Sequence, residues 1–95
     1  MDRKDAYQDK LQAQLDVWKA EIAKLRAKAD LAQADARLKY MEEIDGLRAY
    51  QKKAEARLKE LQDAQGEAWK DVKSGVEAAW DEMSDAMKSA WKRLS

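Results

Sequence analysis

Apolar residues return every three or four positions along almost the whole chain. Steps of three and four residues from Tyr7 land on apolar side chains at every position except Gln65. The mean step is about 3.6 residues, which is the period of an α-helix. The sequence therefore predicts helical segments that share one apolar stripe, which comprises Tyr7, Leu11, Leu15, Trp18, Ile22, Leu25, Ala29, Ala32, Ala36, Tyr40, Ile44, Leu47, Tyr50, Ala54, Leu58, Leu61, Gln65, Trp69, Val72, Val76, Trp80, Met83, Met87, Trp91 and Leu94.

The rhythm of this stripe changes along the chain. Between Leu11 and Ala32 the steps alternate between four and three residues, a heptad pattern that favours left-handed supercoiling. From Leu47 onward the pattern repeats every eleven residues, which favours a nearly straight or slightly right-handed seam. Because eleven residues make three helical turns, the C-terminal tryptophans are expected on one face of their helix: Trp69, Trp80 and Trp91.

A second apolar face is expected only in the middle of the chain. Its members lie roughly opposite the stripe if residues 27–41 are helical, since each residue turns the helix by about 100°. A helix that is apolar on two sides contacts neighbours on two sides. Segment 27–41 is therefore the predicted centre of a bundle, with the second face formed by Ala27, Leu31, Ala34, Leu38 and Met41.

The stripe also indicates where the chain folds back. Its single polar member, Gln65, is followed by Gly66, a residue that weakens helices. These two features predict a break near residues 63–66, between a long helix over about 4–63 and a shorter tryptophan-rich helix over about 67–94.

One continuous helix is the alternative, because the eleven-residue phase runs unbroken from Leu58 to Trp69. Either arrangement gives an all-α, elongated coiled coil with one domain, residues 1–95, that associates with itself. The composition agrees with this fold class, since the chain has no proline and 40% charged residues. The same composition argues against a β-sheet.

Charge and composition exclude several classes of function. The 19 basic and 19 acidic residues balance, so no long-range field draws the chain to nucleic acid. The basic stretch "QKKAEARLK" is interrupted by glutamates, and no nucleic-acid partner is expected. The charged start "MDRKDAYQDK" and the lack of an apolar run of about 18 residues predict a cytoplasmic protein.

Catalytic chemistry has few candidate groups. The chain contains no histidine, no cysteine and no phosphate-binding glycine loop. Acidic neighbours such as Glu42 and Glu43 point about 100° apart on a helix, so they do not converge on a metal ion. Met83 and Met87 suit core packing better than metal ligation. We therefore expect no enzyme activity, no catalytic residue, no cofactor and no metal site.

The tryptophan-rich helix allows two interpretations. Its apolar face suits a protein seam, because three tryptophans left in water exceed what soluble monomers usually expose. It also suits a membrane surface, although residues 67–95 hold five basic and six acidic groups and so lack the cationic excess of interfacial helices. A seam with a second copy, as a dimer or higher oligomer, or with another helical protein is expected, and peripheral lipid binding is the alternative. The predicted interface comprises Trp18, Leu25, Leu31, Leu38, Leu47, Leu58, Trp69, Trp80, Met83, Met87 and Trp91.

Three segments carry a resemblance to known proteins: "KLQAQLDVWKAEIAKLRAKA", "AQADARLKY" and "GEAWKDVKSGVEAAWDEM". Together they resemble a family of short bacterial coiled-coil proteins, most of them uncharacterised and some assigned to the stress response. The resemblance implies a cytoplasmic helical protein with a structural or interaction role under stress, and it supplies no catalytic or ligand residues. The ending "AWKRLS" departs from the family pattern by adding Trp91.

Overall fold

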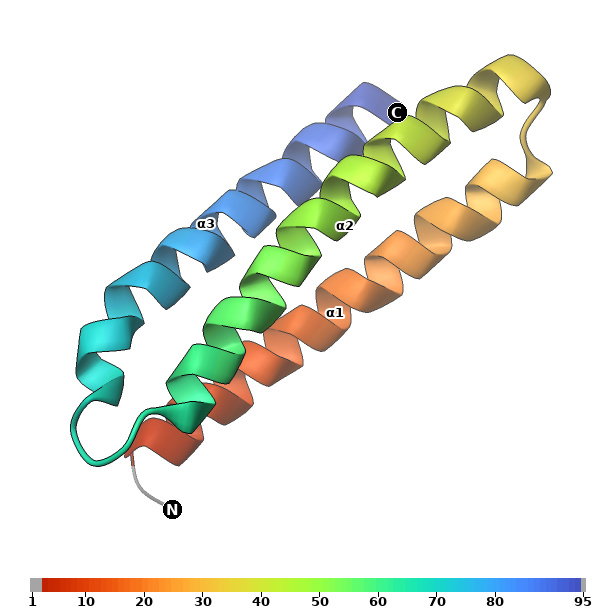
Figure 1. The fold of residues 1–95 in the computed structure, drawn as a ribbon. Coiled ribbons are helices and arrows are strands. Elements are labelled where there is room, and N and C mark those ends of the chain that lie inside the picture. Colours follow the sequence, from red (N-terminus) through yellow and green to blue (C-terminus); the bar gives the residue numbers. More distant parts are fainter. Residues whose placement is uncertain (1–2, 95) are drawn as a thin grey trace.

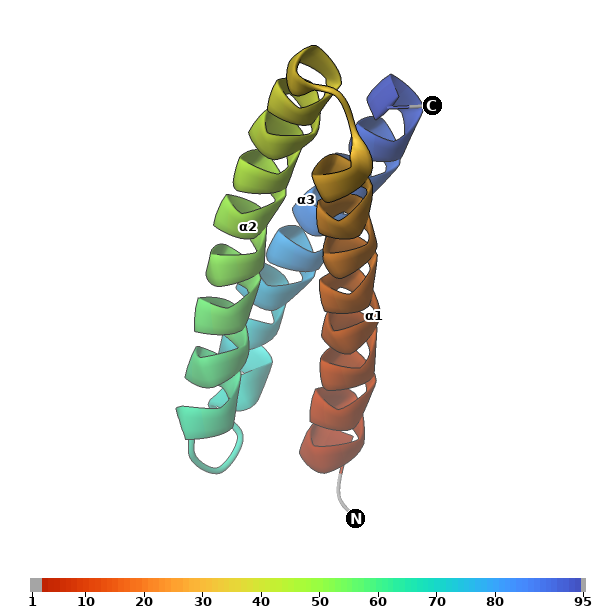
Figure 2. The same cartoon turned by 90° about the vertical axis from the view of Figure 1, so that its right-hand side faces the viewer.

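The computed structural model describes residues 3–94. Over this range the chain forms three helices, α1 (Arg3–Leu31), α2 (Ala34–Asp63) and α3 (Trp69–Leu94). Helices that follow each other in sequence pack antiparallel, and α3 runs obliquely across the pair formed by α1 and α2 (Figures 1 and 2). The bundle measures 52 × 20 × 18 Å. The all-α class and the elongated shape are confirmed, but the predicted two-helix arrangement is wrong.

The predicted long helix over 4–63 is interrupted at Ala32 and Gln33, where the chain reverses between α1 and α2. No glycine or proline marks this turn in the sequence. The reversal instead lets the stripe of α1 face the stripe of α2, and burial of apolar surface is the dominant favourable term in folding. A straight helix would leave that stripe in water, so tertiary packing overrides the local preference for helix.

The second turn lies where the sequence predicted a break. Residues 64–68 connect α2 to α3, and Gly66 adopts a φ of +57°, a left-handed conformation that L side chains avoid. The Lys4 ammonium group of α1 donates a hydrogen bond to the carbonyl oxygen of Ala64. A basic side chain thus satisfies a carbonyl group at the C-terminus of α2.

One chain buries most of the predicted stripe by itself. The core lies along the axis of the bundle and receives side chains from all three helices. Its buried members are Leu11, Leu15, Trp18, Ile22, Leu25, Ala29, Ile44, Leu47, Ala54, Leu58, Leu61, Trp69, Val76, Ala79, Trp80, Met83, Met87 and Ala90. Association with another chain is therefore not needed to cover the stripe.

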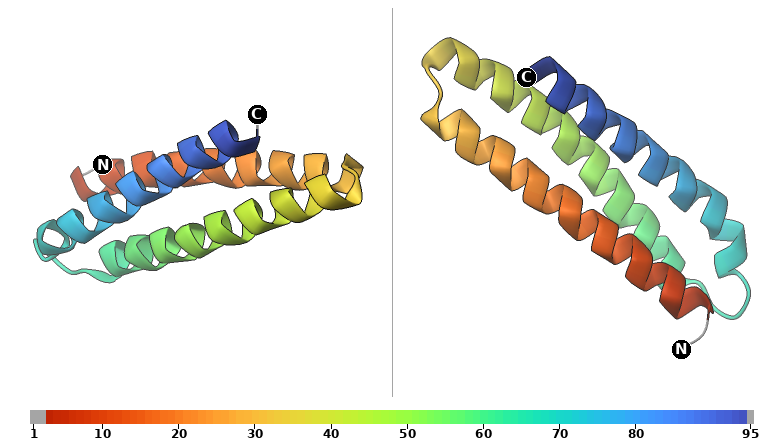
Figure 3. Two further views of the ribbon diagram at one scale, coloured as in Figure 1. Left: turned by 90° about the horizontal axis from the view of Figure 1, so that it is seen from above. Right: turned by 180° about the vertical axis from the view of Figure 1, so that it is seen from behind.

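Segment 27–41 is not the centre of the single-chain bundle. The segment forms the tip of the α1–α2 hairpin, which extends beyond the C-terminal end of α3 (Figures 1 and 3). Leu31 is 90% exposed and Leu38 is 65% exposed at this tip. The predicted second face does not form in the single chain, because it requires one straight helix through 27–41 and the chain turns within that segment.

Candidate interaction surface

Aromatic side chains join α1 to α3 in register. The ring centroids of Trp18 and Trp80 lie 6.0 Å apart with planes tilted by 52°. Those of Tyr7 and Trp69 also lie 6.0 Å apart, with a tilt of 38°. Both geometries fall within the range that favours aromatic pairs. The eleven-residue spacing of the tryptophans in α3 is thus matched by an equal spacing between the rings of α1 that meet them.

The third tryptophan has a different neighbour. Lys28 Nζ lies 5.0 Å from the centroid of the Trp91 ring, a cation–π contact. Trp91 is only partly buried, because α3 ends three residues later. The tryptophan face of α3 therefore packs against its own chain along its full length, most tightly at Trp69 and Trp80.

The predicted interface residues separate into three groups by burial. Leu31 and Leu38 are exposed at the hairpin tip, as described above. Trp91 is partly buried, and the remaining members lie in the core of the same chain: Trp18, Leu25, Leu47, Leu58, Trp69, Trp80, Met83 and Met87. In the folded single chain, Leu31 and Leu38 are therefore the predicted interface residues that are exposed to a partner.

A shallow groove follows the contact between α1 and α3. Val17 is 50% exposed beside it, and the rings of Trp18 and Trp80 form part of its wall. Trp80 Nε1 is buried and has no hydrogen-bond partner within residues 3–94. A buried indole N–H usually has a partner, so this atom stands out as unsatisfied.

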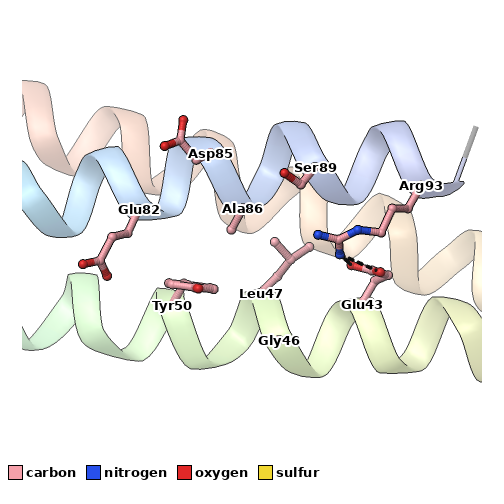
Figure 4. A pocket seen from close by; sticks show the side chains of 9 residues that line it. All are labelled: Glu43, Gly46, Leu47, Tyr50, Glu82, Asp85, Ala86, Ser89 and Arg93. Carbon is pink, nitrogen blue, oxygen red and sulfur yellow. Dashed lines mark hydrogen bonds and ion pairs between the residues drawn. The ribbon is translucent and has the colours of Figure 1, made fainter.

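A second groove separates α2 from α3 (Figure 4). Arg93 Nη1 lies 2.8 Å from a carboxylate oxygen of Glu43 across it, and Lys53 Nζ lies 2.8 Å from Glu82. Asp85 points away from α2 toward solvent (Figure 4). These carboxylates do not converge on one point, so the groove offers exposed ion pairs rather than an acid–base pair. Such exposed pairs contribute little to stability.

Neither a metal site nor a membrane span is found in the part of the chain that the structure describes. Residues 3–94 contain no group of three acidic, histidine or cysteine side chains placed to hold a metal ion. None of the helices in that range is both long enough and apolar enough to cross a membrane.

Sequence reasoning missed the contacts that hold the α1–α2 turn. The Arg37 guanidinium group donates hydrogen bonds to the carbonyl oxygens of Ala29, at 3.2 Å, and Ala32, at 3.1 Å. Sequence reasoning also missed Tyr7 as the neighbour of Trp69. The equal spacing of Tyr7 from Trp18 and of Trp69 from Trp80 could have revealed this pairing, since parallel helices in register repeat their contacts at one interval.

The pKa of Tyr7 provides a test of the packing between the N-terminal ends of α1 and α3. Partial burial, followed by the charge of Glu77 and a hydrogen bond with it, raises the pKa of Tyr7 above 10.0. The folded state therefore favours the neutral phenol. This contribution to stability is complete below about pH 10 and is lost as the pH rises through the raised pKa.

As the pH rises from about 9 to 12, we expect the free energy of unfolding to fall less in Tyr7→Phe than in the parent, because the variant has no phenol to ionise. Thermal melts followed by circular dichroism measure the slope, and Tyr50→Phe, on the α2–α3 groove, serves as the control. Equal alkaline slopes for the parent and Tyr7→Phe would show that the phenol of Tyr7 does not carry this effect.

Comparisons with protein-family models, curated proteins and solved structures return no match for this chain. The resemblance to short bacterial coiled-coil proteins therefore stays a prediction. The class of protein that the geometry defines is an antiparallel three-helix bundle with an aromatic seam and two exposed leucines at the hairpin tip.

Proposed function

We propose that this chain is a non-enzymatic structural or interaction protein that associates with a second copy or with another helical protein. The exposure of Leu31 and Leu38 carries the proposal. Both leucines project from the same end of the bundle, one from α1 and one from α2. Burying a leucine side chain contributes roughly 1.5–3 kcal/mol. An interface at the hairpin tip would bury leucines that the single chain leaves in water, and this burial would stabilise the complex.

Packing of the tryptophans supports this interaction role over the lipid-surface alternative. Trp69 and Trp80 are 9% and 8% exposed, because their rings face α1. A membrane surface would have to displace α1 before it could reach them. A role under stress rests on the family resemblance alone.

Replacing Leu31 and Leu38 with lysine tests the proposal. Both side chains are exposed, so the double variant is expected to keep its helix content and melting temperature within a few degrees. It should weaken self-association by at least about tenfold, since each lysine places a charge in the interface. Sedimentation equilibrium at micromolar concentrations measures the association.

Val17→Lys is the matched control, because Val17 is also exposed but lies near the middle of α1. It should leave the association constant unchanged. A parent protein that remains a 10.9 kDa monomer at all concentrations, with no helical protein bound, would contradict the proposal.

A further inference from the structure

The two turns of this bundle are encoded differently. The α2–α3 turn contains Gly66 at a φ of +57°. Glycine adopts this conformation more readily than other residues, so the sequence itself favours a turn there. The α1–α2 turn consists of Ala32 and Gln33, and no residue other than glycine has a positive φ in residues 3–94. Alanine and glutamine are both good helix formers. Gln33 occupies the N-cap position of α2 without making a side-chain capping bond, so α2 also lacks the usual signal for a helix start.

The apolar stripe keeps its helical phase through the α1–α2 turn. Ala29, Ala32, Ala36 and Tyr40 follow one another at steps of three, four and four residues. If residues 32 and 33 became helical, α1 and α2 would join into one helix with the stripe still on a single face. The local loss would be the two hydrogen bonds from Arg37 to the carbonyl groups of the turn. Helical hydrogen bonds would then satisfy those same carbonyl groups.

We infer that the α1–α2 turn is a hinge through which two copies of this chain exchange helices. In the exchanged dimer, residues 3–63 form one helix, and α1 of each copy packs against α2 and α3 of the other. This inference rests on the proposed self-association and specifies its route. A second copy is the occupant because only an identical chain supplies the contacts that α1 leaves, such as that between the rings of Trp18 and Trp80.

The exposed leucines distinguish this arrangement from association through the hairpin tip. Two long helices that exchange at the hinge run antiparallel, with their hinge segments side by side at the dimer axis. Leu31 and Leu38 lie on the face of the continuous helix opposite the stripe, so the exchange leaves them exposed near the centre of the dimer. The single chain and the dimer share nearly all other contacts, so their balance depends on protein concentration and on the hinge.

Ala34→Pro is the variant that separates the two states. Proline is well tolerated at the first position of a helix, and Gln33 before it already has the extended backbone that proline requires, with φ −68° and ψ 162°. The closed hairpin therefore accepts the substitution. Inside a continuous helix the same proline removes a hydrogen bond and clashes with the preceding turn. The dimer dissociation constant should therefore rise at least roughly 100-fold. Ala34→Ser, which keeps the backbone N–H, should leave the dimer nearly unchanged.

A distance within one chain tests the hinge without changing it. The sequence contains no cysteine, so Lys24→Cys and Arg48→Cys can carry spin labels on the exposed surfaces of α1 and α2. Doubly labelled protein is mixed with an excess of unlabelled protein so that only distances within one chain are measured. A continuous helix separates these positions by about 36 Å, at 1.5 Å per residue. A closed hairpin holds the labels roughly 10–20 Å apart, across two packed helices.

A dimer fraction with the long distance, and its loss in Ala34→Pro, supports the exchange. A dimer that shows only the short distance would overturn the exchange and leave self-association through the hairpin tip standing. An unchanged dimer in a folded Ala34→Pro would also overturn it. A parent without any dimer would remove the proposed self-association and this route together.

Discussion

Trp80→Ala is expected to lower the free energy of unfolding by about 3–5 kcal/mol, the usual cost of truncating a buried tryptophan. Trp80 is 8% exposed and lies in the middle of the aromatic seam, where its ring meets Trp18. Its removal leaves a cavity between α1 and α3 and takes away an aromatic pair worth a further 0.5–1.5 kcal/mol or so. Urea unfolding followed by circular dichroism measures the change.

Two control variants separate packing from hydrogen bonding at this position. Trp80→Phe keeps an aromatic ring and removes the buried indole N–H that lacks a partner within residues 3–94, so it should retain most of the stability. Trp91→Ala should cost less than Trp80→Ala, because Trp91 is only partly buried near the end of α3. If Trp80→Ala cost no more than Trp91→Ala, the aromatic seam would not be a centre of stability.

Leu25→Lys is expected to abolish cooperative folding. Leu25 is fully buried, and among residues 3–94 no carboxylate shares the buried core with it. An ammonium group placed there loses its hydration without gaining a partner, which costs several kcal/mol. A domain of this size has roughly 5–15 kcal/mol of stability, so a large part of it is lost with the cavity and the charge together. Circular dichroism should show reduced helix content and a broad, early melt.

Leu31→Lys is the matched control for this prediction, since the same change is made six residues later on the same helix. Leu31 is 90% exposed, so the variant should fold like the parent. A sharp melt for Leu25→Lys within a few degrees of the parent would contradict the packing of α1 described above.

Aromatic register gives the eleven-residue repeat a physical role. Parallel helices at a constant offset meet at equal intervals, and an interval of three complete turns returns each side chain to the same face. Trp69 and Trp80 therefore meet Tyr7 and Trp18 with nearly the same geometry. A repeat of this kind fixes the axial position of α3 against α1, because a shift by one helical turn would separate both ring pairs at once.

The sequence by itself determined the helical class and most of the core. Its period of about 3.6 residues identifies the positions that become buried in each helix, because one face of a helix must leave water. Gly66 also marks the second turn, since its backbone conformation is one that other residues avoid. The pattern also placed Leu31 on a second apolar face and predicted it, like Leu25 of the stripe, as an interface residue, although Leu31 is exposed and Leu25 is buried in the single chain.

Only the tertiary structure decided where α1 ends and which surfaces remain free. The residues around Ala32 and Gln33 favour helix locally, so no local signal reveals the reversal. The reversal follows from the free energy gained when the stripes of α1 and α2 cover each other, a contact between residues far apart in sequence. That contact turns the predicted bundle centre into an exposed tip and the predicted intermolecular seam into the core of one chain. Periodicity specifies which face of a helix is buried, but the identity of the surface that covers it depends on long-range packing.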